Sequence, residues 1–249
     1  MEIIGRGCIA GNLAAIADRH PAATVLAAGV SSTGVSAAAA FDREAALVRE
    51  TVARCRRDGR VVVFLSSASH AMYGRTDIAA DEDTAVNPQS PYGKHKRALE
   101  CEIADSGATW LALRLSHIVG RGQRSHQLLP ALCEQVRGGT VRIYQGAHRD
   151  LVDVAHVAAS IDGLLSQGVH NEIVNVASGQ PHPIEVIAGG IERRMAASPR
   201  HEIVAAEPVL ARVSIEKLCK LLPPMRSLSA PGYLDQVLDR YVGCYAEAG

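Results

Sequence analysis

The chain has 249 residues, enough for one large or two small domains with a substantial hydrophobic core. Hydrophobic residues make up 47% of the chain and charged residues 21%, a composition too apolar for an intrinsically disordered protein. The 26 basic residues balance 26 acidic ones, so we expect no nucleic-acid partner and no membrane partner. Six scattered cysteines form no zinc-binding pattern, and no signal peptide or transmembrane helix is predicted. These features indicate a cytoplasmic protein that acts on a small molecule, and we expect it to bind no metal.

Short apolar runs alternate with longer amphipathic runs in the first half of the chain. We expect strands at residues 2–4, 24–28, 61–65 and 110–115, and helices from the first glycine turn to about residue 19, at 36–57 and at 92–105. The run Val61–Leu65 is apolar on both faces, as a central parallel strand must be. This order predicts an α/β fold with a Rossmann-like parallel sheet and right-handed crossovers. In the long second helix we expect the charged side chains to face outward: Arg43, Glu44, Arg49 and Glu50.

The second half of the chain is less regular. We expect helices at 127–136 and 154–165 and strands at 140–144 and 172–176, followed by short elements rich in Pro and Gly. Residues 1–120 are predicted to form the cofactor-binding and catalytic core, with its sheet completed by about 149–178. Residues 121–249 are predicted to form mainly a small α+β substrate-binding lobe. In such sheets ligands bind beyond the carboxyl ends of the strands.

The segment from Tyr92 to Lys96 carries a tyrosine and a lysine that are four residues apart on a predicted helix. Side chains at this spacing project from the same face. A nearby ammonium group stabilises a phenolate, which suits Tyr92 to acid–base chemistry near neutral pH. The pair alone is weak evidence for a catalytic site, because tyrosine and lysine at this spacing are also common on exposed helices.

A pair of serines, Ser66 and Ser67, directly follows the run predicted as the central strand. A hydroxyl at that position can hydrogen-bond the same substrate oxygen that Tyr92 protonates, and so stabilise an oxyanion. The order of glycine turn, serine and Tyr-x-x-x-Lys resembles the short-chain dehydrogenase/reductase superfamily.

Longer blocks narrow the resemblance to the extended, nucleotide-sugar-modifying branch, the NAD-dependent epimerase/dehydratase family. The segments similar to this family span nearly the whole chain: FLSSAS…YG (64–74), NPQSPYGKHKRALE (87–100), LRLSHIVGRGQ (113–123), RDLVDVAHVA (149–158) and EIVNVASGQPHPI (172–184). The resemblance implies a nicotinamide cofactor and a nucleotide-diphosphate-sugar substrate. It also implies a homodimer formed through the helices that begin near Ser36 and Tyr92.

The resemblance implies a role for each matching residue. Tyr92 would be the acid–base group, Lys96 would hold the nicotinamide ribose, and Ser67 would bind the sugar oxygen, with Ser66 and Ser69 as alternatives. Arg149 would bind the diphosphate, although a surface salt bridge with Asp150 or Asp153 is also consistent with the sequence. His117 stands where relatives carry an asparagine that faces the substrate, and a core histidine is an equally good interpretation. The implied cofactor-binding residues are Gly5, Arg6, Gly7, Cys8, Ile9, Ala10, Gly11, Ala28 and Gly29, with Tyr92 and Lys96.

The sequence departs from the family pattern in two places. Cys8 stands in the middle position of the glycine-rich turn, where glycine would let the backbone approach a pyrophosphate. Only thirteen residues separate Gly11 from Val25, so a strand–helix–strand segment of the family is missing. A right-handed crossover directly to the place of the family's fourth strand would move the first helix to the other face of the sheet. The missing segment supplies the acidic residue that selects NAD, and Arg6 could meet a 2′-phosphate, so NADP(H) is favoured over NAD(H).

Dehydratases of the family carry an acidic residue directly after the catalytic Ser or Thr, whereas here Ala68 and Ser69 follow Ser67. We therefore expect an oxidoreductase that resembles the compact 4-ketoreductases of deoxysugar and natural-product biosynthesis, acting on a nucleotide-linked 4-keto-6-deoxyhexose. A nucleotide-sugar 4-epimerase is the first alternative. A non-catalytic sugar-nucleotide-binding protein with a degenerate cofactor site is the second.

Overall fold

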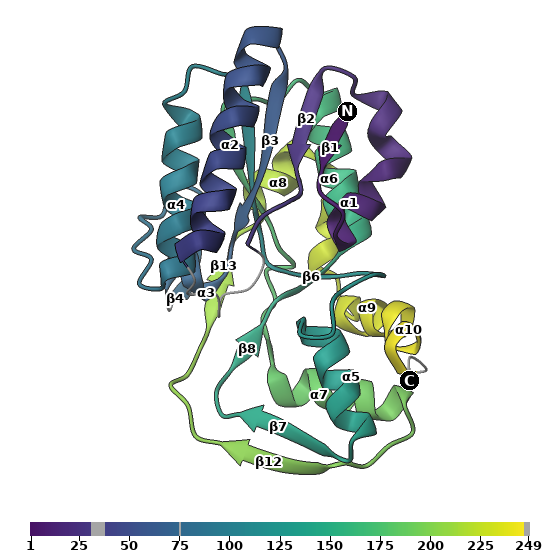
Figure 1. Cartoon of the computed structure of the whole chain (residues 1–249). Helices are drawn as coiled ribbons and strands as arrows, with labels where there is room; N and C mark the ends of the chain where they lie inside the picture. The colour runs from purple at the N-terminus through teal and green to yellow at the C-terminus, as the bar shows by residue number, and fades with distance from the viewer. Residues whose placement is uncertain (31–37, 75, 247–249) are drawn as a thin grey trace.

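The computed structural model describes residues 1–30, 38–74 and 76–246. Its centre is a parallel sheet of five strands in the order β1-β2-β3-β5-β10, with β1 at one edge and β10 at the other. Figure 1 labels β1, β2 and β3 of this sheet. The predicted α/β fold with a Rossmann-like sheet is confirmed. The five strands are β1 (Glu2–Ile4), β2 (Ala23–Leu26), β3 (Val61–Ser67), β5 (Trp110–Leu115) and β10 (Glu172–Val176).

Two long helices cover one face of this sheet. α2 (Ala38–Asp58) packs against α4 (Pro91–Ala104), and both contact β3. Because side chains alternate along a strand, Val62 and Phe64 join the apolar layer beneath these helices, whereas Val63 and Leu65 join the layer on the other face. The predicted start of α2 at Ser36 lies outside the described residues.

The opposite face carries α1 (Cys8–Leu13) and the 3-10 helix η1 (Ala14–Arg19), which pack against α6 (Val154–Ser166) (Figure 1). The chain steps across the sheet in the same direction from β1 to β2 as from β2 to β3, yet the two connecting segments cover opposite faces. The two connections therefore have opposite hands, and the expectation of right-handed crossovers is wrong for one of them. The physical reason is local: α1 buries Leu13 in the apolar layer that α6 covers.

A smaller lobe lies beyond the carboxyl ends of the strands, in the lower half of Figure 1. In this lobe α5 packs against α7 and β7, and β7 pairs in parallel with β12. The last helices of the chain close the lobe, whereas α8 returns to contact β10 of the main sheet. The elements are α5 (Leu128–Arg137), β7 (Thr140–Tyr144), α7 (Ile184–Arg194), β12 (Arg200–Val204), α8 (Glu216–Leu221), the 3-10 helix η2 (Pro223–Ser229), α9 (Tyr233–Tyr241) and α10 (Gly243–Ala246).

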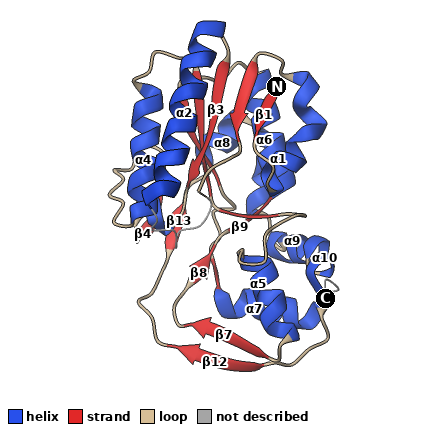
Figure 2. Ribbon diagram, viewed as in Figure 1, coloured by secondary structure: helices blue, strands red, loops and turns tan. Residues whose placement is uncertain are grey.

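Short strand pairs lie between the sheet and the lobe (Figure 2). β6 pairs with β9, β8 with β11 and β4 with β13, while the short helix α3 follows β3. Their bounds are α3 (His70–Tyr73), β4 (Thr76–Ala80), β6 (His117–Val119), β8 (His148–Arg149), β9 (Leu151–Asp153), β11 (His182–Pro183) and β13 (Ala211–Val213). These pairs bring distant loops to the carboxyl end of the sheet.

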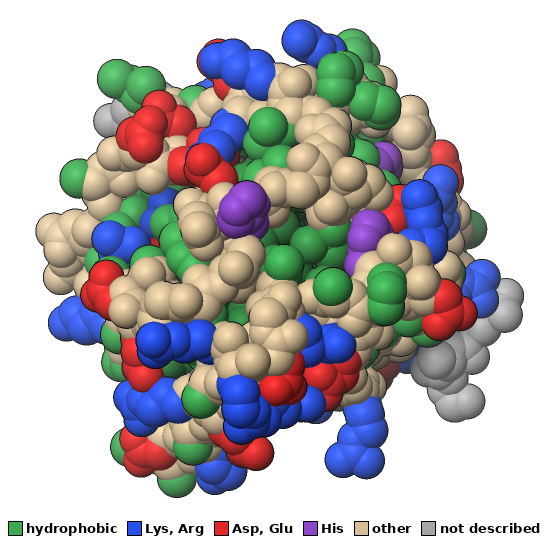
Figure 3. All heavy atoms as spheres, turned by 90° about the horizontal axis from the view of Figure 1, so that it is seen from above, with side chains coloured by type: hydrophobic (Ala, Val, Ile, Leu, Met, Phe, Trp, Pro, Cys, Tyr) green, Lys and Arg blue, Asp and Glu red, His purple; other side chains and the backbone are tan. Residues whose placement is uncertain are grey.

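The surface carries charges of both signs. On the face seen in Figure 3, basic side chains lie beside acidic ones around hydrophobic patches, as expected for equal numbers of the two. Within the described residues, no helix combines the length and the apolar character that a membrane-crossing segment requires.

Candidate active site

A cavity of about 410 Å³ opens at the carboxyl ends of β2, β3 and β5. This is the position at which ligands bind in parallel α/β sheets, and the volume is within the range of about 300–1,000 Å³ that is usual for small-molecule sites. The cavity brings together predicted residues from distant parts of the chain: Ser67, Tyr92 and Lys96 from the catalytic set, Cys8, Ile9, Ala28 and Gly29 from the cofactor set, and Ser69, His117 and Arg149 from the substrate set.

Tyr92 lies in the first turn of α4. The Ser90 hydroxyl caps this helix by accepting a hydrogen bond from the backbone N–H of Gly93 at 3.1 Å. Gly93 is required because a Cβ there would lie 1.8 Å from the carbonyl oxygen of Ala71 in α3. This close approach places Tyr92, which is only 7% exposed, in the cavity wall.

Lys96 lies one helical turn further on, and its ammonium group is buried among defined partners. Nζ donates to Oε1 of Glu44 at 2.7 Å and to the carbonyl oxygen of Leu65 at 3.2 Å. It lies 5.1 Å from the centroid of the Phe64 ring and 5.9 Å from that of Tyr92. The expectation that Glu44 faces outward is wrong, because this side chain turns inward to pair with Lys96 and is 3% exposed.

The three candidate serines have different partners. Ser66 Oγ donates to Oε1 of Glu100, beneath α4, at 2.6 Å. Ser67 and Ser69 share a hydrogen bond of 2.7 Å between their hydroxyl groups at the cavity. Ser69 also caps α3 by accepting from the backbone N–H of Ala71. Ser67 is therefore the hydroxyl at the end of β3 that is tied neither to a carboxylate nor to a helix cap.

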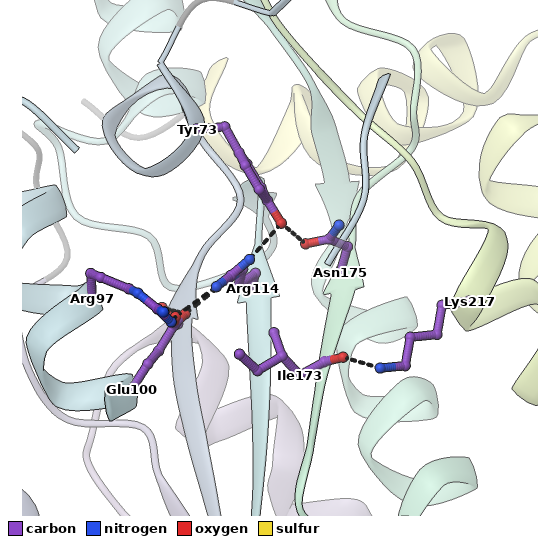
Figure 4. Close-up of polar contacts among 8 residues, drawn as sticks. Tyr73, Arg97, Glu100, Arg114, Ile173, Asn175 and Lys217 are labelled. Carbon is purple, nitrogen blue, oxygen red and sulfur yellow. Dashed lines mark hydrogen bonds and ion pairs between the residues drawn. The ribbon is translucent and has the colours of Figure 1, made fainter. Parts of the chain in front are cut away.

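A buried polar network behind the cavity was not predicted from the sequence (Figure 4). Glu100 accepts two hydrogen bonds from Arg114, and Arg114 donates a third to the hydroxyl of Tyr73, which in turn donates to Asn175. Burial alone would lower the pKa of Arg114, but its hydrogen bonds with Glu100 raise it above the usual value. Because Ser66 also donates to Glu100, the network links the end of β3 to α4, β5 and β10.

Arg149 lies between the main cavity and a second one of about 280 Å³. One of its nitrogens donates to the carbonyl oxygen of His148 at 2.8 Å. The two acids near it in sequence have other partners, since Asp150 accepts from backbone N–H groups of the loop after β10 and Asp153 pairs with Arg240. Burial lowers the pKa of Arg149. Within the described part of the chain no carboxylate neutralises this guanidinium, so it can bind an anion that enters either cavity.

Two histidines beside Arg149 are held in their neutral form. Burial, followed by the charge of Arg149, lowers the pKa of His117 to about 3. The same two causes lower the pKa of His70, which lines the second cavity. His117 lines both cavities from β6, so it offers a neutral imidazole to a polar ligand rather than serving as a fully buried core residue.

The glycine turn contributes only part of its predicted set to the cavity. Gly5 has a φ of +143°, and a Cβ there would lie 2.4 Å from the carbonyl oxygen of Ala27, so the close approach of β1 and β2 requires glycine. Burial, followed by the charge of Asp153, raises the pKa of Cys8 to about 11 and keeps it a thiol. The remaining members are not in the described cavity lining: Arg6, Gly7 and Gly11 are exposed, and Ala10 is buried.

Comparison with known families decides the classification. The model of the NAD dependent epimerase/dehydratase family matches residues 9–177, more than half of the chain. The chain belongs to this family. A comparison with curated proteins finds no match.

Several solved structures share the fold. UDP-glucose 4-epimerase from Thermus thermophilus, in complex with NAD, is 24% identical with a TM-score of 0.76, covering 97% of this chain and 83% of that one. dTDP-glucose 4,6-dehydratase from Bacillus anthracis, also with NAD, is 18% identical with a TM-score of 0.79, covering 98% and 79%. RMD from Pseudomonas aeruginosa, complexed with NADPH, is 17% identical with a TM-score of 0.78, covering 100% and 90%. At these identities the likeness shows a shared fold.

Proposed function

We propose that this protein is a sugar 4-ketoreductase that uses NADPH to reduce a nucleotide-linked 4-keto-6-deoxyhexose, as deoxysugar pathways require. The observation that carries the proposal is that Ser67, Tyr92 and Lys96 meet in one cavity whose described lining contains no carboxylate. Such a site can deliver a proton to a carbonyl oxygen and stabilise the developing charge. It lacks the acidic group that an elimination would use.

Tyr92, Ser67 and Lys96 would each have a separate role in the reduction. The nicotinamide, when bound, supplies a hydride to the ketone carbon. The Tyr92 hydroxyl gives its proton to the ketone oxygen, and the Ser67 hydroxyl hydrogen-bonds that oxygen as negative charge develops on it. The Lys96 ammonium group stabilises the phenolate that remains on Tyr92.

The chain's residues fit the nicotinamide–ribose half of the cofactor. An ammonium group has three donors, and the described partners of Lys96 engage two of them, which leaves one for a ribose hydroxyl in the cavity. The described chain adds no strand beyond β1 that could supply an acidic residue to the adenosine ribose, and the glycine turn carries Arg6. Both features favour NADP(H) over NAD(H). RMD, which shares the fold, is complexed with NADPH.

The substrate side of the site suits a nucleotide diphosphate sugar. Arg149 presents a guanidinium without a described carboxylate partner, and its forked geometry matches phosphate oxygens. His117 and His70 are neutral and can hydrogen-bond sugar hydroxyls without adding charge. We assign residues 1–120, with the strand supplied by 149–178, to the catalytic core, and most of 121–249 to substrate binding.

The 4-epimerase remains the second candidate, because UDP-glucose 4-epimerase from Thermus thermophilus shares the fold, and oxidation and re-reduction of a sugar hydroxyl also require a group that takes up and returns a proton. An epimerase must retain its cofactor while the keto-sugar turns over. Here β1 is the edge strand, and the described chain adds no strand beyond it to cover the adenosine half. Exchange of cofactor in each turnover, as in a reductase, suits this open edge better.

The test is oxidation of NADPH by the purified protein, followed by absorbance, with a panel of nucleotide-linked 4-keto-6-deoxyhexoses. We expect turnover by the wild-type protein and a loss of about 10²-fold or more in Tyr92→Phe, because the proton donor is removed. Tyr144→Phe, at an exposed tyrosine, is the matched control and should keep the wild-type rate. Interconversion of UDP-glucose and UDP-galactose without net use of NADPH would instead identify an epimerase.

A further inference from the structure

Glu44 of α2 is a buried carboxylate that has three polar partners among the described residues. Oε1 accepts from Nζ of Lys96 at 2.7 Å, and Oε2 accepts from the backbone N–H of Val30 at 3.0 Å and lies 3.1 Å from Nε2 of His95. The Glu44 side chain is 2% exposed and that of Lys96 is 6% exposed. The carboxylate therefore joins α2, the end of β2 and α4 at a single point behind the cavity wall.

The backbone is shaped to admit this carboxylate. Gly29 has a φ of +148°, and a Cβ there would lie 2.2 Å from Oε1 of Glu44. The glycine after β2 thus leaves the space that the carboxylate fills. Gly29 also lines the cavity, so the ion pair lies directly behind its surface.

The electrostatic consequence concerns Lys96. A buried ammonium group without a counter-charge tends to lose its proton, because burial penalises the charged form. The carbonyl oxygen of Leu65 and the rings of Phe64 and Tyr92 are the other described neighbours of Nζ, and none carries a full negative charge when Tyr92 is protonated. Glu44 is thus the described group that balances the charge of Lys96.

We propose that Glu44 is a positioning residue that keeps Lys96 in its ammonium form and fixes Nζ at the cavity wall. This inference rests on the proposed function, in which that ammonium group supports Tyr92 and holds the cofactor ribose. His95, the other titratable group on the carboxylate, faces Glu44 from α4 together with Lys96.

The experiment measures the protonation of Lys96 in the protein without cofactor or substrate. Lysine acetylation by acetic anhydride, followed by mass spectrometry over a range of pH, reports the fraction of free amine at each lysine. In Glu44→Gln we expect the midpoint of Lys96 acetylation to fall by at least about one pH unit, a roughly tenfold increase in free amine below the midpoint. Lys94, exposed on the same helix, is the internal reference and should not change.

Two control variants make the result specific. Glu50→Gln, at an exposed position of α2, should leave the Lys96 midpoint unchanged. Glu44→Asp keeps the negative charge, so its Lys96 midpoint should lie much closer to that of the wild type than the midpoint in Glu44→Gln. A faster reaction of Lys96 by the same factor at every pH, with no shift of the midpoint, would mean that Glu44 only packs the site and would overturn the proposal. If Glu44→Gln does not fold, the double variant Glu44→Gln with Lys96→Met decides: it should fold, because the charge that Glu44 balances is removed with it, and a double variant that still does not fold would overturn the proposal. Since the labelling needs no turnover, failure of the reductase assay would leave this result intact.

Discussion

At the scale of single residues, two adjacent serines at the end of β3 have opposite tasks. Both residues line the cavity, but the Ser66 hydroxyl is engaged by the buried carboxylate of Glu100, whereas the Ser67 hydroxyl contacts that of Ser69. Because successive side chains of a strand point to opposite faces, the two hydroxyls serve different sides of the sheet. The Ser66 hydroxyl supports the buried pair of Glu100 and Arg114, which Figure 4 shows, and the Ser67 hydroxyl serves the proposed chemistry.

This division predicts different losses for the two alanine variants. Ser67→Ala should lower the turnover number by about 10²–10³-fold, as expected when one donor to a developing oxyanion is removed, with little change in stability. Ser66→Ala should lower the free energy of unfolding by about 1.5–3 kcal/mol, because a buried hydrogen bond to a charged group is lost. Steady-state kinetics and urea unfolding of both variants measure the two effects. The reverse pattern, with stability lost in Ser67→Ala and rate in Ser66→Ala, would contradict the assignment.

At the scale of elements, α4 carries the proposed catalytic pair, Tyr92 and Lys96, and approaches α3 closely. Helix propensity alone predicts that Gly93→Ala stabilises the protein by about 1 kcal/mol. We expect the opposite sign, a loss of about 1–3 kcal/mol, because the new methyl group would meet the carbonyl oxygen of Ala71. Urea unfolding should show this loss, with Lys94→Ala, at an exposed neighbour, within about 0.5 kcal/mol of wild type. A stabilised Gly93→Ala would mean that this close approach is not real.

The elements also show what the sequence could predict. β5 and β10 were placed to the residue, at Trp110–Leu115 and Glu172–Val176, because a buried parallel strand is a short, mostly apolar run, here interrupted only by Arg114 in β5 and by Asn175 after Glu172 in β10. Pairs such as β4 with β13 were missed, since three to five residues carry too little periodicity and their partners are far away in the chain. Glu44 was misplaced for a related reason. Its burial depends on Lys96, which is 52 residues away, and no local pattern reports that partner.

At the scale of the whole molecule, the shortened first half of the sheet decides how a dinucleotide could bind. The spacing between Gly11 and Val25 predicted the missing strand–helix–strand segment, and β1 is accordingly an edge strand that pairs with β2. The spacing did not decide the side on which α1 lies, because that depends on packing against α6. In the proposed assignment Tyr92 and Lys96 would hold the nicotinamide end of the cofactor, whereas the described chain adds no strand beyond β1 that would cover the adenosine end. This asymmetry favours a cofactor that is bound reversibly.

The most direct test of the reductase is therefore calorimetric titration of the purified protein with NADPH and with NADH. We expect saturable binding of both nucleotides, tighter for NADPH, and a protein that is purified without bound nucleotide. Tightly held NAD in the purified protein would contradict the reductase and favour the epimerase. Absence of binding by either nucleotide would contradict an enzyme of this class and leave a sugar-nucleotide-binding protein.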